Sequence, residues 1–275
     1  MAFGRLLPLS DSRPAADESQ QQAHQNNQTY DYQQRPLLMQ TMKPPTYQID
    51  RPIYLLGDHH GFTGEIFDAV EKQNVRNAVI LHVGDGEEGI SFGPRQFEEL
   101  NKAFAKRKLL FLGMRGNHCD PNLFDGSIDL PHYKLVPDYT RLAVNGKSWL
   151  LIGGAISIDR LDRINGFNWW PQETFELRHE LAGPADVLVT HSGPRWIGPS
   201  SPNHIVDLYA RREDESTGSD LITELETERM LHEELFRLVR PKHWYLGHFH
   251  TSEVVRHQDC EIRILDINEL HMHRN

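Results

Sequence analysis

Residues 57–61 read Gly-Asp-His-His-Gly and directly follow a short apolar run, Pro-Ile-Tyr-Leu-Leu, at residues 52–56. An apolar run of this length, bounded by proline and glycine, predicts a buried strand that ends at the pentapeptide. Asp58 and His60 lie in the turn that follows, where both side chains can reach one metal ion, one through oxygen and one through nitrogen. A single Asp-x-His is a weak signal, because turns often carry these residue types.

The same arrangement, a strand-like run that ends in residues able to bind metal, recurs four more times along the chain. The runs at 79–83, 109–112, 187–189 and 244–246 lead into Gly84-Asp85, Arg115-Gly116-Asn117-His118, Thr190-His191 and Gly247-His248-Phe249-His250. In open α/β sheets, sites form outside the carboxyl ends of the strands, so five such ends can contribute side chains to one crevice. The repeated pattern therefore predicts one metal site assembled from distant parts of the chain.

In this order, the segments GDHHG, GDGEEG, RGNHCD, THSGP and GHFH resemble the five motifs of the calcineurin-like metallophosphoesterases. The resemblance spans about residues 53–250. It implies an α/β fold in which two sheets pack as a β-sandwich flanked by helices, in four layers, α/β/β/α. The alternation of strand-like and helix-like segments agrees with an α/β class.

The remaining segments predict further elements of that fold. Amphipathic patterns predict helices over about 64–74 and 94–108, and the pair Asn145-Gly146 predicts a hairpin between strands at 142–144 and 149–152. A third helix is expected to begin at a Ser219 cap and to end at Arg240, before Pro241, with its leucine stripe in the core. Residues 196–218 are expected to form a long loop, either a solvated insertion or a segment over the site.

The resemblance implies two divalent metal ions, joined by a bridging hydroxide that acts as the nucleophile. Asp85 would bind both ions. The ligands carried over from the family are Asp58, His60, Asp85 and His250 for the first ion, and Asp85, Asn117, His191 and His248 for the second. Mixed oxygen and nitrogen ligands suit manganese, iron or zinc, with manganese as the first expectation.

The resemblance also implies that His118 stabilises or protonates the leaving oxygen. Protein Ser/Thr phosphatases of this family carry Asp-Arg-Gly after the second motif, where the Asp orients the catalytic His and the Arg binds phosphate. Here that stretch reads Glu87-Glu88-Gly89, so Glu88 is expected to orient His118 and the arginine is missing. Arg115, two residues before Asn117, is a candidate replacement.

A second candidate for phosphate binding is the pair Arg160 and Arg163, which precedes Trp169-Trp170. Two arginines three residues apart can face the same way, and arginine binds phosphate through two parallel hydrogen bonds. The tryptophans could stack on a base or ring of the substrate. The alternative is that the tryptophans lie in the core and the arginines form ion pairs.

Four neighbours of the motifs are expected to have structural roles. His59 is expected to point away from the metals, and His82 to pack within its strand. Asp120 is a candidate N-cap before Pro121, and Cys119 lacks a partner base that would make it a nucleophile.

These residues predict a hydrolase that cleaves a phosphate mono- or diester; a small molecule, a nucleotide and a phosphoprotein all remain open as substrates. One alternative is a monoesterase like the Ser/Thr protein phosphatases. Another is a non-catalytic metal-binding interaction module on the same fold. Because all seven ligand positions hold suitable residue types, the enzyme is the favoured hypothesis.

Composition and charge indicate the domain organisation and the absence of one class of partner. With 275 residues and 38% hydrophobic content, the chain is expected to form one domain at 49–275, after a polar, Gln-rich, disordered tail at 1–48. The tail is either a tether for partners or dispensable. A net charge of −10 argues against an extended nucleic-acid-binding face.

Cysteine content and apolar runs indicate the compartment. Two cysteines, Cys119 and Cys260, imply no disulfide framework and favour a reducing compartment. No transmembrane-length apolar run and no secretory signal are recognisable, so the cytoplasm is expected and no membrane partner is predicted. The oligomeric state is open.

Overall fold

The computed structural model describes residues 44–198 and 203–274, which contain two β-sheets with helices on their outer faces. The five-stranded sheet has the order β12-β2-β3-β4-β5. Its strands are β2 (Ile53–Leu56), β3 (Val79–His82), β4 (Leu110–Gly113), β5 (Tyr133–Leu135) and β12 (Leu270–Met272). β2 to β5 pair in parallel, and β12 pairs antiparallel to β2.

The seven-stranded sheet has the order β1-β6-β7-β8-β9-β11-β10. Its strands are β1 (Thr46–Ile49), β6 (Thr140–Val144), β7 (Lys147–Ile152), β8 (Val187–Thr190), β9 (His243–Leu246), β10 (Glu253–His257) and β11 (Cys260–Ile264). β7, β8 and β9 run parallel to one another, so their carboxyl ends meet at one edge. The five strands predicted next to the motifs are all confirmed.

Alternation along each central strand explains the layers. On β3, Val79 and Leu81 face the core between the two sheets, whereas Ile80 faces the helices. On β8, Val187 and Val189 enter the same inter-sheet core, and Leu188 packs on the opposite side. Because both faces are covered, these strands are apolar in succession up to their last residues, His82 and Thr190, rather than alternating with polar residues.

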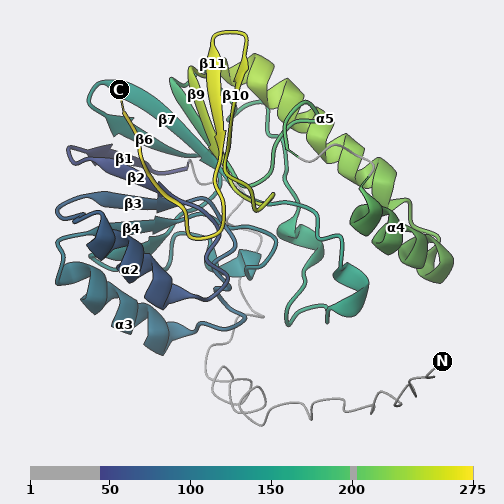
Figure 1. The fold of residues 1–275 in the computed structure, drawn as a ribbon, viewed down its shortest axis with the longest axis horizontal. Coiled ribbons are helices and arrows are strands. Elements are labelled where there is room, and N and C mark those ends of the chain that lie inside the picture. The colour runs from purple at the N-terminus through teal and green to yellow at the C-terminus, as the bar shows by residue number, and fades with distance from the viewer. Residues whose placement is uncertain (1–43, 199–202, 275) are drawn as a thin grey trace, which may run out of the picture. The chain divides into compact units, whose positions relative to one another are not determined.

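Helices complete the outer layers, and Figure 1 shows them on opposite sides. α2 (Thr63–Lys72) and α3 (Pro94–Ala105) bury Ile66, Val70, Phe97 and Phe104 against the five-stranded sheet. α5 (Leu221–Val239) packs against the seven-stranded sheet, and α4 (His204–Thr217) contacts α5. The predicted four-layer α/β/β/α sandwich is confirmed. Short 3-10 helices lie at Pro121–Leu123 (η4), Arg160–Asp162 (η5) and Pro171–Glu173 (η6).

The predicted hairpin is present, with β6 and β7 antiparallel and joined at Asn145-Gly146. Both turn residues have positive φ angles, 49° and 79°. This is the backbone that a tight two-residue turn requires, and Asn and Gly adopt it at low cost.

Three boundaries differ from the predictions. The loop expected at 196–218 is wrong, because α4 forms there, with the Asn203 side chain accepting hydrogen bonds from the amides of Ile205 and Val206. α4 was missed because its one buried residue is Glu213, which leaves no apolar stripe to recognise. The cap of α5 is Asp220 rather than Ser219.

The third boundary is the start of the folded domain. β1 pairs with β6 from Thr46, so the limit predicted between residues 48 and 49 cuts through a strand. Residues 1–43 of the predicted tail lie outside the described residues. Among the described helices, none combines the length and the apolar character needed to cross a lipid bilayer.

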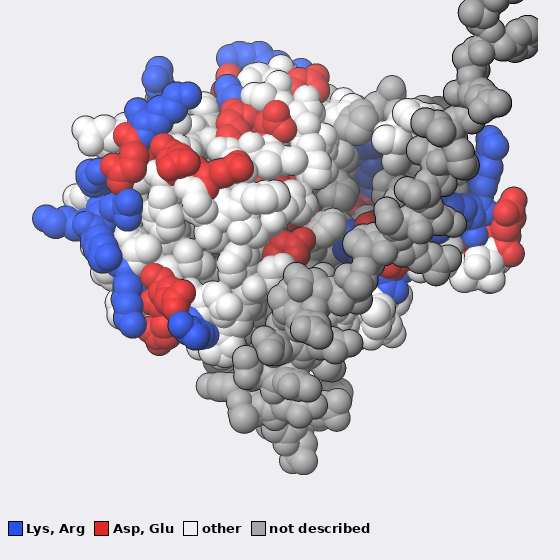
Figure 2. Space-filling model, turned by 60° about the horizontal axis from the view of Figure 1, so that its bottom comes forward, with Lys and Arg blue, Asp and Glu red and all other residues white. Residues whose placement is uncertain are grey.

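Charged side chains of both signs are interspersed on the face shown in Figure 2, with lysines and arginines beside aspartates and glutamates. The view shows one face only. The expectation that the chain lacks an extended nucleic-acid-binding face therefore stays a prediction.

Candidate metal centre

The carboxyl ends of five strands from both sheets bring the predicted ligands together. Asp58 follows β2, Asp85 follows β3, His191 follows β8, and His248 follows β9. Asn117 and His118 follow β4. In each sheet these residues lie at the carboxyl ends of the strands, and the two sets of strand ends meet. Residues up to 190 positions apart in sequence therefore become neighbours.

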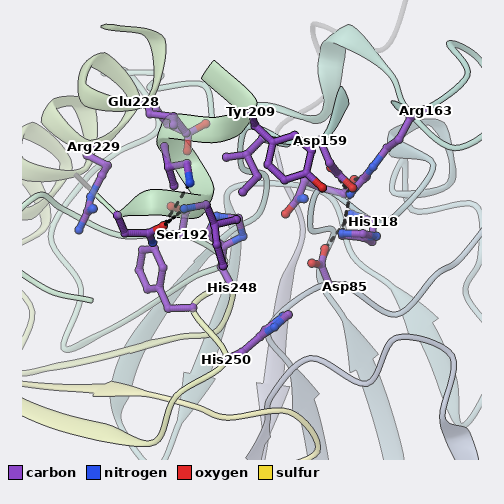
Figure 3. A pocket seen from close by; sticks show the side chains of 17 residues that line it. Asp85, His118, Asp159, Arg163, Ser192, Tyr209, Glu228, Arg229, His248 and His250 are labelled. Carbon is purple, nitrogen blue, oxygen red and sulfur yellow. Dashed lines mark hydrogen bonds and ion pairs between the residues drawn. The ribbon is translucent and has the colours of Figure 1, made fainter. Parts of the chain in front are cut away.

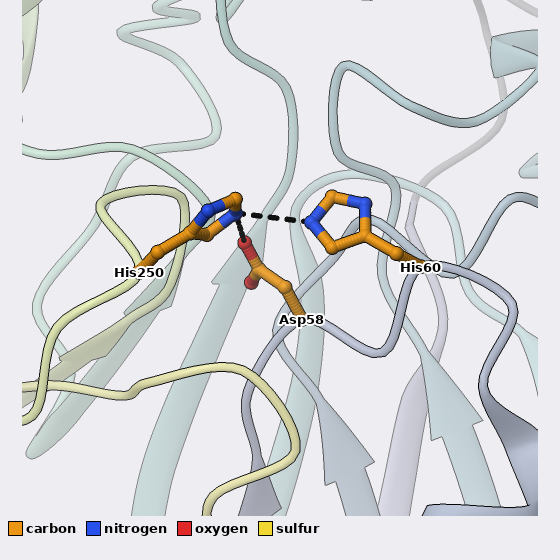
Figure 4. A group of neighbouring side chains, drawn as sticks. All are labelled: Asp58, His60 and His250. Atoms are coloured by element: carbon orange, nitrogen blue, oxygen red, sulfur yellow. Dashed lines mark hydrogen bonds and ion pairs between the residues drawn. The ribbon is translucent and has the colours of Figure 1, made fainter. Parts of the chain in front are cut away.

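The first group consists of Asp58, His60 and His250 (Figure 4). The two imidazoles face each other with their Nε2 atoms 3.0 Å apart, and Asp58 Oδ2 lies 3.3 Å from His250 Nε2. Asp58 is fully buried, and its Oδ1 atom has no hydrogen-bond partner among the described residues. An orphaned carboxylate oxygen beside converging imidazole nitrogens fits a bound cation.

The second group consists of Asp85, His191 and His248. His191 Nε2 lies 3.2 Å from Asp85 Oδ1 and 3.1 Å from Asn117 Oδ1. His191 Nδ1 lies 3.0 Å from the backbone carbonyl of Val83, which leaves Nε2 directed at the group. A backbone carbonyl in this position typically orients an imidazole for metal binding.

Asp85 also belongs to a further group with His60 and His118. The carboxylate therefore lies between the first and second groups. A two-metal site needs such a shared ligand, and the position of Asp85 provides it.

The backbone around the ligands is strained. Asp85, His60, His248 and His250 have φ angles of 59°, 39°, 66° and 48°, in the left-handed region that L-residues rarely adopt. Such conformations are retained at functional sites, where the surroundings determine them. Gly116 has a simple steric role, because a Cβ atom there would collide with Asp85 Oδ1.

The carboxylates and imidazoles of the centre shift one another's pKa values. Burial lowers the pKa of His191, but the carboxylates of Asp85 and Asp58 raise it to about 9. Burial lowers the pKa of His248 well below its ordinary value, which keeps that imidazole neutral and able to bind metal. Asp85 stays ionised: burial raises its pKa, but the neighbouring His191 and His118 hold it well below its usual range.

His118 lies at the rim of the centre. Its amide donates a hydrogen bond to Asp85 Oδ1 at 2.8 Å. Nδ1 lies 3.4 Å from Glu87 Oε1, and Nε2 lies 2.6 Å from Arg163 Nη2. Burial lowers the pKa of His118, but Asp85 and Glu87 together raise it above its ordinary value. A raised pKa favours the protonated form that a general acid requires.

The expectation that Glu88 orients His118 is corrected by the structure. Glu88 is fully buried and accepts hydrogen bonds from Cys119 Sγ at 3.3 Å and from Tyr133 Oη at 3.2 Å. Burial raises its pKa to about 7. Glu87, rather than Glu88, has its carboxylate beside Nδ1 of His118. The sequence Glu87-Glu88 predicts that one glutamate lies beside His118, but it does not indicate which one.

The three arginines expected to bind substrate have different surroundings. Arg163 lines the cavity at the centre, where it forms an ion pair with Asp159 at 2.7 Å. Arg115 instead forms an ion pair with Asp138 and donates to the backbone carbonyls of residues 172–174. Arg115 does not line that cavity and holds together the segments after β4 and η6.

Arg160 also has partners away from the cavity. Its guanidinium pairs with Glu213 of α4 and, through two hydrogen bonds of 2.7 and 2.9 Å, with Glu224 of α5. Of the two roles considered for Arg160, phosphate binding and ion pairing, its contacts match ion pairing. Trp170 is buried, and Trp169 donates to Glu173 at 3.1 Å; neither lines the cavity.

The four neighbours of the motifs that were expected to have structural roles all contact other protein groups. His82 is fully buried within β3 and stacks on Phe111. His59 is buried and packs on His82 with ring centroids 4.5 Å apart. Asp120 caps η4 by accepting a hydrogen bond from the Asn122 amide at 3.0 Å. Burial raises the pKa of the Cys119 thiol well above its usual value, so a thiolate nucleophile is disfavoured.

Comparison with known proteins identifies the class. The family model for calcineurin-like phosphoesterases matches residues 51–252, so the chain belongs to the calcineurin-like phosphoesterase family. The chain is therefore a metal-dependent hydrolase that acts on phosphate esters. The predicted family is confirmed. No curated protein matches the chain.

Solved structures similar to this chain share little sequence with it. TT1561 of Thermus thermophilus is 11% identical, with a TM-score of 0.49 over 82% of this chain and 99% of that chain. The cold-active protein-tyrosine phosphatase of a Shewanella species is 12% identical, with a TM-score of 0.37 over 84% and 75%. A protein serine/threonine phosphatase from Saccharomyces cerevisiae is 15% identical, with a TM-score of 0.38 over 84% and 73%.

Proposed function

We propose that this chain hydrolyses a phosphate monoester at a centre of two divalent ions that share Asp85. The observation that supports the two-metal centre is the position of Asp85 between two groups of metal-binding side chains, and the monoester is the substrate class that the experiment below separates from the diester. Asp58, His60 and His250 would hold one ion with Asp85, and Asn117, His191 and His248 would hold the other.

The ions would supply Lewis acidity, which lowers the pKa of water to near neutrality and offsets the charge on the phosphate oxygens. Manganese is the first ion to test, and iron and zinc suit the same mixed set of ligands. Hydrolysis breaks the bond between phosphorus and the leaving oxygen, while water supplies the new oxygen on phosphorus.

The residues of this chain have distinct parts in that reaction. Arg163 lies 2.6 Å from His118 and would bind a phosphate oxygen at the same rim. Because the Arg163 guanidinium can only donate, a proton on His118 Nε2 requires that Arg163 turn to the phosphate. His118, with its raised pKa, would then give that proton to the leaving oxygen. Glu87 would keep the imidazole oriented through its contact with Nδ1.

Metal removal and readdition test this function. Full-length protein stripped of metal with a chelator is assayed with p-nitrophenyl phosphate and bis-p-nitrophenyl phosphate, before and after manganese is restored. We expect turnover only in the restored protein, with two ions bound per chain and the monoester preferred. A preference for the diester would contradict the monoesterase assignment, and tight binding of two ions without any turnover would favour a non-catalytic module.

A further inference from the structure

A cavity of about 400 Å³ extends from the metal centre toward α4 and α5. Figure 3 shows Asp85, His248 and His250 in the lower part of the view, with Glu228, Tyr209 and Arg163 above them. A volume of this size suits a small ligand rather than a folded partner. A phosphoryl group at the centre would direct its leaving group into the remaining space.

Besides the candidate ligands, the cavity has a mainly apolar wall. α4, α5 and two neighbouring loops contribute its apolar and aromatic members, which are Ile158, Ile205, Val206, Tyr209, Leu225 and Phe249. Ile205 is 49% exposed, although it lies on a cavity wall where a ligand could cover it. Binding is favoured when an apolar ligand replaces water on such a wall, because apolar surface is removed from water.

The three charged side chains Glu228, Arg229 and Asp159 near this wall already have protein partners. Glu228 accepts a hydrogen bond from the Phe175 amide at 3.2 Å. Arg229 donates to the carbonyls of Pro194 and Ile197, and its guanidinium lies 5.3 Å from the Phe249 ring centroid. Asp159 is paired with Arg163. A charged leaving group would lose its water here without gaining a matching partner, which opposes its binding.

The wall is also fixed in place. The Arg160 side chain, 15% exposed, joins Glu213 of α4 to Glu224 of α5, whereas the exposed pair of Arg212 and Asp162 adds little. These ion pairs connect both helices to the segment that carries Ile158 and Asp159. The cavity is therefore pre-formed, which favours a ligand of matching shape.

From these contacts we infer that the cavity binds the leaving group of a small phosphate monoester whose alcohol is compact and apolar or aromatic. Charged alcohols, such as the zwitterion of free serine, fit it poorly, and a serine within a folded phosphoprotein is excluded by size. This inference rests on the proposed function and specifies its substrate class. The reaction is the same hydrolysis, with phosphate and the free alcohol as products.

A set of esters with similar chemistry tests the inference. Benzyl phosphate, ethyl phosphate and O-phosphoserine are all esters of primary alcohols, so intrinsic differences in their cleavage are small compared with differences in binding. With the manganese-loaded full chain, we expect kcat/KM for benzyl phosphate to exceed that for O-phosphoserine by at least about tenfold. Ethyl phosphate should lie between them, since each buried methylene group contributes.

Two variants relate the preference to the wall. Leu225→Asn and Tyr209→Ser should each lower the ratio of kcat/KM for benzyl phosphate over O-phosphoserine roughly fivefold to tenfold, mainly through KM. Leu208→Asn is the matched control: Leu208 lies on α4, is 58% exposed and does not line the cavity. Its ratio should equal that of the unmodified protein.

The outcomes separate the inference from the proposed function. Metal-dependent turnover at similar kcat/KM for all three esters, or a preference for O-phosphoserine, would overturn the inference and leave the proposed function standing. Turnover of none of the esters, by protein that carries two manganese ions, would overturn both. A ratio that falls equally in Leu208→Asn would show that the wall does not set the preference.

Discussion

The metal centre and the helical wall enclose the same cavity but are held by different forces. The candidate centre lies at the ends of parallel strands that are buried on both faces, and four of its seven candidate ligands have positive φ angles. The wall depends on α4, whose one buried residue is Glu213, and on ion pairs that join it to η5 and α5. The candidate metal centre is therefore positioned by the apolar core, whereas the position of α4 depends on a few ion pairs.

The strongest test of this contrast removes the shared ligand. Asp85→Asn should lower metal-dependent kcat by at least about 10³-fold, because an amide cannot neutralise two cations as a carboxylate does. Metal content, measured on the purified protein, should fall below two ions per chain. Asp129→Asn is the control, since Asp129 is an exposed carboxylate paired with Lys134. Full activity in Asp85→Asn would remove the shared-ligand model.

A smaller effect is expected for the proposed proton donor. His118→Gln should lower kcat about 10²-fold, because the leaving oxygen would depart without a proton. Metal content should stay at two ions. The loss should shrink for p-nitrophenyl phosphate, whose acidic leaving group needs little protonation. Equal losses for p-nitrophenyl and benzyl phosphate would argue that His118 acts in some other way.

The helical wall should respond differently when its ion pair is broken. Arg160→Met removes hydrogen bonds to two carboxylates and should destabilise the docking of α4 by roughly 2 kcal/mol. We expect KM for benzyl phosphate to rise several-fold with kcat nearly unchanged, and amide exchange in α4 to accelerate. Arg212→Met is the matched control, since that exposed ion pair contributes little. A lower kcat with an unchanged KM in Arg160→Met would contradict the separation of wall and centre.

The smallest predicted effect distinguishes the two adjacent glutamates. Glu87 raises the pKa of His118, so Glu87→Gln should lower that pKa and move the alkaline limb of the pH–kcat/KM profile to lower pH. Activity at pH 8 should fall roughly threefold, because less of His118 would be protonated. Glu88→Gln, which leaves Glu87 and His118 intact, should not move that limb. A shift in Glu88→Gln alone would restore the original assignment.

Much of the fold could be predicted because its signals are local. The five strands of the motifs, the hairpin at Asn145-Gly146 and helices α2 and α3 each follow from apolar periodicity or turn chemistry within a few residues. α4 could not be predicted in this way. Its stabilising contacts join Arg160 and Asp162 to residues about 50 positions away, and no periodic pattern marks them.

The amino-acid sequence by itself determined the family and the set of candidate ligands, because short motifs at strand ends contain those residues in a specific order. Only the tertiary structure decided which of two glutamates faces His118, and which of three arginines lines the cavity. The physical reason is that side-chain direction depends on local backbone angles and on distant partners. The cavity wall likewise could not be predicted from the sequence, because α4, α5 and the loops that form it meet only in the folded chain.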